Sequence, residues 1–296
     1  MTSVDETAIR SVMGTVGSIQ AIEGAGFPVR RPFPTEDLAM YDPFLLLDEM
    51  GPTDYKPGEA VGAPDHPHRG FETVTYMLNG SLQHKDSAGN LGVLSPGGVQ
   101  WMTAGAGVVH SEMPSQQVMQ YGGRLHGFQL WVNLPAAKKM VQPRYQEFPS
   151  EDVPTATNEA GVWVRVIAGE AFGIEAIIDT HTPILFLHFV LQPGASYVQR
   201  MPSEYNAFAY IIEGRGRFGI EELEEAIEGN LVAFDQDGGQ VRSTNTGTIP
   251  LSFLLLGGLP INEQLARYGP FVMNTNDEIY KALEDYHSGR MGVIDF

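Results

Sequence analysis

This chain of 296 residues contains many short apolar runs, each bounded by turn-forming residues, and few folds accommodate such a pattern. The runs are rich in β-branched and aromatic residues, and they include 72–78, 125–134, 162–168, 184–191 and 251–257. Glycine, proline, asparagine and aspartate separate them at short intervals, and the chain contains 34 Gly and 20 Pro. This pattern is typical of strands joined by tight turns, so it predicts an all-β protein built as a sandwich or barrel.

Helical periodicity is concentrated at the end of the chain. Apolar residues at 279, 282, 283 and 286 repeat with the spacing of one helix face. Asn274 to Asn276 offer an N-cap, and Gly289 can end the helix. We therefore expect one amphipathic helix of about three turns near the C-terminus, and a weaker helical segment over 262–268.

Length and a polar central segment predict two domains. Domains usually contain about 100 to 150 residues, so this chain is long enough for two. Residues 142–161 are polar, contain proline and lack periodicity, as linkers do. Residues 75–83 and 209–217 share an aromatic-apolar-apolar-polar-glycine pattern, as two copies of one β-domain would. The expected organisation is an N-terminal domain over 1–141, a linker over 142–161 and a C-terminal domain over 162–296.

Cysteine content and charge exclude several classes of function. The chain has no cysteine, so disulfides, zinc–thiolate sites, iron–sulfur clusters and thiol nucleophiles are excluded. The formal charge of −18 repels phosphate backbones, so we expect no direct nucleic-acid partner. No apolar run approaches the roughly 20 residues of a membrane span, and the N-terminus lacks a secretory signal pattern. We therefore expect a cytoplasmic protein without membrane contact.

Two tripeptides, His66-Pro67-His68 and His110-Ser111-Glu112, supply three imidazoles and a carboxylate. In a strand, residues i and i+2 point to the same face. Two such strands lying side by side inside a barrel can therefore hold one metal ion. This donor set suits a divalent first-row metal, with iron(II) as the preferred candidate and nickel, cobalt, manganese, copper and zinc as compatible alternatives. Four protein ligands on an octahedral ion leave two positions open for chemistry.

The surrounding motifs resemble a known family. His66-x-His68, followed by Glu72 and Gly80 and later by a Pro/Gly turn before His110, resembles the two cupin motifs. More specifically, the chain resembles the pirin family of bicupins, and the segments that carry this similarity are 65–80, 100–114, 125–135 and 269–279. The resemblance implies two tandem antiparallel cupin (jelly-roll) β-barrels, a short C-terminal helix, and a single metal in the N-terminal barrel.

The same resemblance assigns the metal ligands to His66, His68, His110 and Glu112. When the two copies are laid over each other, the second carries Arg200 and Pro202 opposite the first two histidines. Only the N-terminal barrel is therefore expected to bind metal.

Further residues near these motifs are weaker candidates. Glu72 occupies the place of the carboxylate ligand of many other cupins, and here we expect it to accept a hydrogen bond from a ligand imidazole. His84, Trp101 and His126 are candidates for the wall of a pocket, although we favour ordinary structural roles in the barrel for them. Arg69 follows the first histidine pair, points to the opposite face, and is expected to form an ion pair.

The resemblance implies a quercetin 2,3-dioxygenase-like oxidoreductase. A flavonol or similar aromatic substrate would bind the metal through oxygen and react with O2, with Glu112 as the proton acceptor. A second interpretation is a metal- and redox-responsive regulator that acts through protein partners. A third is an oxidative or hydrolytic activity on another catechol or enol. A bicupin whose barrels pack on each other is expected to be a monomer.

Overall fold

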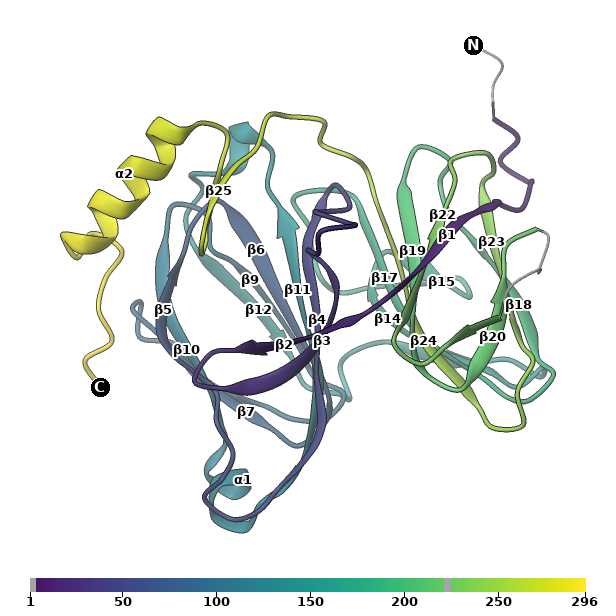
Figure 1. The fold of residues 1–296 in the computed structure, drawn as a ribbon, viewed down its shortest axis with the longest axis horizontal. Helices are drawn as coiled ribbons and strands as arrows, with labels where there is room; N and C mark the ends of the chain where they lie inside the picture. The colour runs from purple at the N-terminus through teal and green to yellow at the C-terminus, as the bar shows by residue number, and fades with distance from the viewer. Residues whose placement is uncertain (1–3, 221–224) are drawn as a thin grey trace. The chain divides into compact units, whose positions relative to one another are not determined.

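Figure 1 shows the computed structural model, which describes residues 4–220 and 225–296. The chain forms two compact units dominated by strands. The first-barrel unit comprises 20–40, 44–152 and 261–296, and the second-barrel unit comprises the described parts of 1–19, 41–43 and 153–260. The predicted all-β architecture of two antiparallel cupin barrels is therefore confirmed.

The first-barrel unit contains a seven-stranded sheet and a four-stranded sheet, both antiparallel. The larger sheet has the order β12 (Arg144–Phe148), β9 (Val99–Thr103), β6 (Phe71–Asn79), β11 (Gly123–Asn133), β4 (Phe44–Tyr55), β3 (Phe27–Phe33) and β2 (Ile19–Glu23). The smaller has the order β5 (Ala63–His68), β10 (Val108–Pro114), β7 (Leu82–Asp86) and β8 (Leu91–Leu94). Short elements complete the unit: α1 (Gln116–Tyr121), a 3-10 turn η1 (Ala136–Lys138), the hairpin β25 (Ala266–Tyr268) and β26 (Phe271–Met273), and α2 (Asn276–His287).

The second-barrel unit repeats this arrangement. Its seven-stranded sheet has the order β1 (Val12–Gly17), β22 (Asn230–Phe234), β19 (Asn206–Glu213), β24 (Leu251–Gly258), β17 (Ile184–Leu191), β14 (Val162–Ala168) and β13 (Thr155–Thr157). Its four-stranded sheet has the order β18 (Ser196–Arg200), β23 (Gln240–Asn245), β20 (Arg215–Phe218) and β21 (Glu225–Ile227). A two-stranded hairpin joins β15 (Glu170–Ala171) and β16 (Ile174–Glu175).

The ends of the chain pack differently from the expected division at 1–141 and 162–296. The N-terminal strand β1 pairs with β22, with Val16 opposite Leu231, so it belongs to the second-barrel unit. Residues 261–296 belong instead to the first-barrel unit. Strand pairing between residues more than 200 positions apart leaves no local signal, which is why the sequence pattern does not reveal this exchange.

The C-terminal helix is present as expected. α2 begins after Thr275, whose side chain and that of Glu278 form a reciprocal capping box, and Ile279 and Ala282 are buried on its inner face. The predicted helical segment over 262–268 is wrong, because Ala266–Tyr268 forms strand β25 and its backbone pairs with β26. The short helix α1, over Gln116–Tyr121, was not expected. Within the described ranges, neither α-helix is long and apolar enough to cross a membrane.

Candidate functional site

The two histidine-bearing tripeptides lie on neighbouring strands of the four-stranded sheet. β5 and β10 are antiparallel, and their register places His110 opposite His66 and Val108 opposite His68. Because cross-strand neighbours project from the same face of a sheet, His66, His68 and His110 all point into the first barrel. The alternation expected from the sequence therefore places three imidazoles together.

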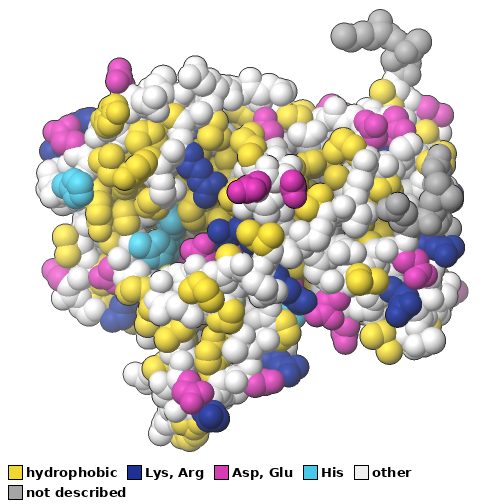
Figure 2. Space-filling model, viewed as in Figure 1, with side chains coloured by type: hydrophobic (Ala, Val, Ile, Leu, Met, Phe, Trp, Pro, Cys, Tyr) yellow, Lys and Arg dark blue, Asp and Glu magenta, His cyan; other side chains and the backbone are white. Residues whose placement is uncertain are grey.

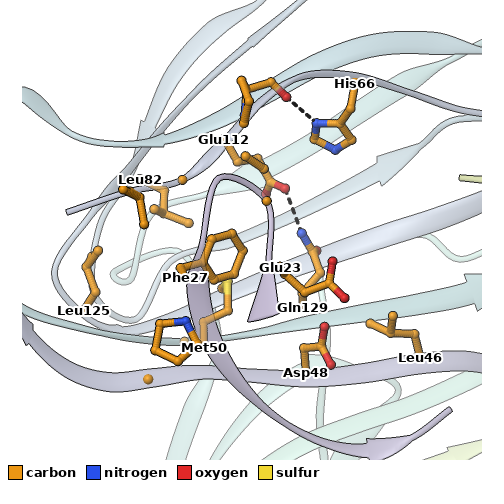
Figure 3. A pocket seen from close by; sticks show the side chains of 18 of the residues that line it. Glu23, Phe27, Leu46, Asp48, Met50, His66, Leu82, Glu112, Leu125 and Gln129 are labelled. Carbon is orange, nitrogen blue, oxygen red and sulfur yellow. Dashed lines mark hydrogen bonds between the residues drawn. The ribbon is translucent and has the colours of Figure 1, made fainter. Parts of the chain in front are cut away.

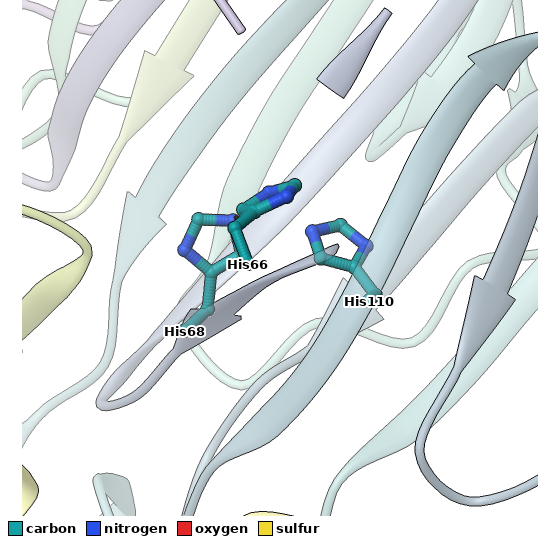
Figure 4. A group of neighbouring side chains, drawn as sticks. All are labelled: His66, His68 and His110. Carbon is teal, nitrogen blue, oxygen red and sulfur yellow. Dashed lines mark hydrogen bonds between the residues drawn. The ribbon is translucent and has the colours of Figure 1, made fainter. Parts of the chain in front are cut away.

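The three imidazoles form a compact group that we call the histidine triad. One ligand nitrogen from each of His66, His68 and His110 lies within 4.8 Å of the other two. The ring centroids are separated by 4.4 to 4.9 Å. In Figure 4 the three rings face one another from the two adjacent strands. This spacing suits one metal ion bound by three nitrogens.

Hydrogen bonding sets the donor atom of His66. Its Nδ1 donates to the carbonyl oxygen of Pro64 at 2.8 Å, because a carbonyl can only accept. In the neutral ring this leaves the lone pair on Nε2, and Nε2 lies 3.1 Å from Nε2 of His68. Two imidazole nitrogens that face each other at this distance need a shared proton or cation between them. A bound metal satisfies that need.

Burial favours the neutral form of the other two histidines. His110 is completely buried and His68 is nearly so. Desolvation, together with the charge of neighbouring His66, holds the pKa of both imidazoles well below the usual value of 6.5. Both ring nitrogens of His110 lack a hydrogen-bond partner within the described part of the chain. Neutral imidazoles with uncommitted lone pairs are the form that binds metals.

Glu112 lies near the triad but outside it. The pairing of β10 with β5 is irregular between His110 and Glu112, so Glu112 stands opposite Ala63. Its Oε1 accepts a hydrogen bond from Thr75 Oγ1 at 2.8 Å, and its Oε2 accepts one from Gln129 Nε2 at 2.8 Å. The irregular register and these two donors from the facing sheet account for its separation from the three imidazoles. Its role as a metal ligand therefore stays a prediction.

A cavity of about 550 Å³ opens onto the triad. His66, His68 and Glu112 line it at one side. Its other walls are largely apolar and include Phe27 and Met50, which Figure 3 shows together with Glu112 and Gln129. Figure 2 shows histidine side chains reaching the surface in a hollow among hydrophobic side chains, with acidic and basic groups beside them. The size and lining are those of a pocket for a small organic molecule.

Charged side chains are also part of the cavity wall. Arg31 donates two hydrogen bonds to the carboxylate of Asp48, at 2.7 and 2.6 Å, and also contacts Glu23. Burial raises the pKa of Asp48 to about 6, against the opposing effect of the Arg31 guanidinium. Arg267 stacks its guanidinium over the ring of Trp131, which in turn contacts His68 edge-on with centroids 5.2 Å apart. The cavity therefore combines apolar walls with fixed polar groups.

The weaker candidates occupy varied positions. His126 lines the cavity, and its Nε2 lies 2.7 Å from Glu49 Oε1. Glu72 is fully buried and accepts a hydrogen bond from Thr103 Oγ1 at 2.7 Å. His84 lies 2.6 Å from Glu147 and stacks on Tyr145, outside the cavity lining. Trp101 is fully buried in the barrel and is also outside that lining. Direct roles of these residues in the site stay predictions.

Arg69 forms the ion pair expected from its position. Its guanidinium NH1 lies 2.8 Å from the carboxylate of Asp285 on α2, and its Nε donates to the carbonyl oxygen of Ala106. The pair is almost completely buried.

The described residues of the second barrel include no comparable group of ligands. Across 4–220 and 225–296, the histidine triad is the one cluster of three or more His, Asp or Glu side chains with metal-binding spacing. The second barrel is filled by apolar side chains, among which Phe189, Phe218 and Phe253 are in ring contact. That only the first copy binds metal stays a prediction.

Several residues of the site could not be identified from the sequence. Thr75 and Gln129, which hold Glu112, lie within the pirin-like segments 65–80 and 125–135 but carry no ligand pattern of their own. Arg31, Asp48 and Arg267 line the cavity and lie outside the pirin-like segments. They are brought together by strand pairing across the first-barrel unit. The alternating pattern of β6 and β11 could have predicted that Thr75 and Gln129 are cross-strand neighbours, but not which partner they would bind.

Comparisons with known proteins identify the family. The Pirin family model matches residues 26–132, and the model of the pirin C-terminal cupin domain matches residues 186–292. Human pirin is 43% identical over 284 residues, which cover 96% of this chain and 94% of the human protein. A pirin-like protein of Solanum lycopersicum is 45% identical over 270 residues, or 91% of this chain and 89% of that protein.

A solved structure extends the comparison to the whole fold. The crystal structure of a quercetin 2,3-dioxygenase from Acinetobacter baumannii superposes with a TM-score of 0.90 at 36% identity, covering 97% of this chain and all of that chain. The two family models cover both barrels, and the relatives are similar along nearly the full length. This chain therefore belongs to the pirin family.

Proposed function

We propose that this protein is a metal-dependent dioxygenase that cleaves a flavonol such as quercetin. The observation that carries the proposal is the histidine triad, whose nitrogens converge at a cavity of about 550 Å³ with largely apolar walls. The similarity to the dioxygenase of Acinetobacter baumannii supports the same reaction class.

The residues present fit a divalent transition metal. His66, His68 and His110 would hold it, and Glu112 is the proposed fourth ligand. The facing nitrogens of His66 and His68 and the two uncommitted nitrogens of buried His110 are the observations that support this fit. Iron(II) is the proposed metal, and nickel, cobalt, manganese, copper and zinc are compatible with the donors. When bound, the metal would lower the pKa of a coordinating hydroxyl and provide the redox chemistry that O2 requires.

The cavity walls would bind and orient a flat aromatic substrate. Apolar side chains such as Phe27, Met50 and Leu125 would exclude water from its rings. The pair of Arg31 and Asp48 offers fixed donors and acceptors on the wall to hydroxyl groups of the substrate. These contacts would hold the reacting ring beside the triad.

Glu112 is the proposed proton acceptor. It lines the cavity beside the triad, and its carboxylate is held in place by Thr75 and Gln129. A flavonol whose 3-hydroxyl enters this side of the cavity would transfer the hydroxyl proton to a Glu112 oxygen. The hydrogen bonds from Thr75 and Gln129 orient the carboxylate and limit its motion.

A direct assay tests this function. Purified protein should contain close to one transition metal per chain, consume O2 when quercetin is added, and remove the visible absorbance of quercetin. A panel of flavonols, catechols and enols, read by O2 consumption, would identify the preferred substrate. Stoichiometric metal without turnover of any member would contradict the enzyme proposal and favour a metal-responsive protein that acts through partners.

A further inference from the structure

The C-terminal segment 266–296, which we call the C-terminal clamp, contacts the outer side of both strands that carry the triad. Figure 1 shows its helix α2 beside the sheet that contains β5. The helix packs its buried residues Ile279 and Ala282 in one apolar cluster with Val109. Val109 directly precedes His110 on β10, so the two side chains point to opposite faces of that strand. The clamp therefore covers the back of one ligand position.

Arg69 links the clamp to the other ligand strand. It directly follows His68, and its side chain is 5% exposed. Its guanidinium donates through Nε to Ala106, in the turn that leads into β10, and lies 2.8 Å from Asp285 on α2. One buried cation thus joins the end of β5, the start of β10 and the clamp. The two triad strands meet at this point.

Backbone contacts tie the clamp still closer to β5. The amide of Val272 donates to the carbonyl oxygen of Arg69 at 3.0 Å. A Cβ added at Gly70 would lie 2.0 Å from the carbonyl oxygen of Val272, so this approach requires a glycine. The buried ammonium of Lys139 donates hydrogen bonds to the carbonyl oxygen of Gly70, at 2.8 Å, and to that of Val272, at 3.0 Å. The segment after His68 is thereby fixed to the clamp.

We propose that the C-terminal clamp positions the histidine triad for metal binding, and that Asp285, acting through Arg69, is a positioning residue of the metal site. Metal sites require their ligands to be held within about 0.5 Å of the binding geometry. Loss of the Asp285 carboxylate leaves the Arg69 guanidinium buried without its anion, and the strand ends around His68 and His110 would shift to hydrate it. The proposal rests on the metal-binding function proposed above for the triad.

Metal titration of the full-length protein tests the proposal. Apoprotein of the wild type and of Asp285→Asn would be titrated with cobalt(II), following both the dissociation constant and the visible absorption bands of the bound ion. We expect Asp285→Asn to weaken cobalt(II) binding about 10- to 100-fold, as substitutions behind metal ligands do, and to change the band positions. The wild-type titration alone tests metal binding, and the ratio of variant to wild type tests the clamp.

Two controls separate positioning from general stability. Lys281→Ala removes an exposed partner of Asp285 on the same helix, together with its surface pair to Glu284, and leaves the Arg69 contact in place. We expect cobalt(II) binding to change less than about twofold. Val99→Ala removes a fully buried methyl pair on β9 of the same barrel, which should lower the Tm without moving the absorption bands.

The proposal would be overturned if Asp285→Asn bound cobalt(II) with the affinity and absorption bands of the wild type. It would also be overturned if Asp285→Asn weakened cobalt(II) binding no more than Val99→Ala does. If Asp285→Asn does not fold, Asp285→Glu keeps the charge but displaces it by one methylene. The same loss of affinity and band shift are then expected, and wild-type behaviour of that variant would equally overturn it.

Discussion

The two barrels share one topology but differ in what fills them. Each pairs a seven-stranded sheet with a four-stranded sheet in the same strand order, so β5 and β10 of the first correspond to β18 and β23 of the second. The first pair directs histidines inward beside a cavity, whereas the second directs Gln199, Val241 and Ser243 to buried positions. Its interior is a continuous apolar cluster.

This difference separates the requirements of the fold from those of the site. The second barrel shows that the same topology closes around apolar side chains, with no cluster of metal-binding spacing among its described residues. The first barrel is less fully packed: it contains a cavity of about 550 Å³ and three imidazoles, of which His68 and His110 are buried and His66 is partly exposed. It carries the C-terminal clamp on the back of the ligand strands. The contrast between a filled and a hollowed barrel can be tested by substitutions in each.

The largest expected effect follows from removing a triad histidine. His110→Ala should abolish stoichiometric metal binding and flavonol turnover, with metal affinity at least about a hundredfold weaker, because two imidazoles remain. The control is His188→Ala in the second barrel, where the imidazole is buried and bonded to Ser252. Elemental analysis of both purified variants is the measurement. Loss of metal from the His188 variant, or full metal in the His110 variant, would contradict the assignment.

Core truncation should distinguish the filled barrel from the hollowed one. Phe253→Ala, in the aromatic cluster of the second barrel, should lower the free energy of unfolding by about 3–5 kcal/mol while leaving the metal content unchanged. Phe27→Ala, on the cavity wall of the first barrel, should cost only about 1–2 kcal/mol, because its ring already faces empty space. Denaturant unfolding of both variants compares them, and equal losses would argue against the contrast.

Substitution of Glu112 tests the chemistry of the cavity. Glu112→Gln preserves the shape of the side chain and removes the proton acceptor. Its amide oxygen can still accept from Thr75, and its NH2 group can donate to Gln129 once the Gln129 amide turns over. Turnover of the metal-loaded protein should fall about a hundredfold. Glu147→Gln, beside His84 and away from the cavity lining, serves as the control and should keep turnover within a few-fold.

The outcome also separates two roles of Glu112. Unchanged turnover with metal bound would remove it as the proton acceptor. Loss of metal together with turnover would place it in the ligand set.

The smallest expected effect is a loss of folding stability at acid pH that arises from Asp285 in the C-terminal clamp. Although burial opposes it, hydrogen bonds from Arg69, Arg290 and Lys281 hold the pKa of Asp285 well below its usual 3.8. The unfolded chain therefore takes up a proton at this carboxyl near pH 3.8 while the folded protein does not. Stability from Asp285 is complete above that pH and is lost as the pH falls through and below it.

Thermal unfolding between pH 5 and pH 3 measures this effect. The Tm of the wild type should fall more steeply than that of Asp285→Asn, since the variant has no carboxyl to protonate. Parallel plots of Tm against pH for the two proteins would show that protonation of Asp285 does not contribute to the loss of stability at low pH.

Much of the fold could be predicted because its signals are local. The runs at 72–78, 125–134, 184–191 and 251–257 coincide with β6, β11, β17 and β24, since alternation and turn residues act over a few positions. The capping residues around Thr275 likewise predicted α2. The predicted helix over 262–268 was wrong because a short apolar pattern does not distinguish a helix from a strand. Backbone pairing with β26 makes Ala266–Tyr268 a strand, β25.

Residue types, spacing and the alternation of side chains along a strand were enough to predict the all-β class, the pirin resemblance and the convergence of His66, His68 and His110. Three features depend on the folded barrels instead. Glu112 is bonded to Thr75 and Gln129, a cavity remains beside the triad, and β1 belongs to the second-barrel unit while residues 261–296 belong to the first. Alternation is set by the local backbone, whereas register irregularities, cavities and long-range pairing depend on how the whole barrel closes.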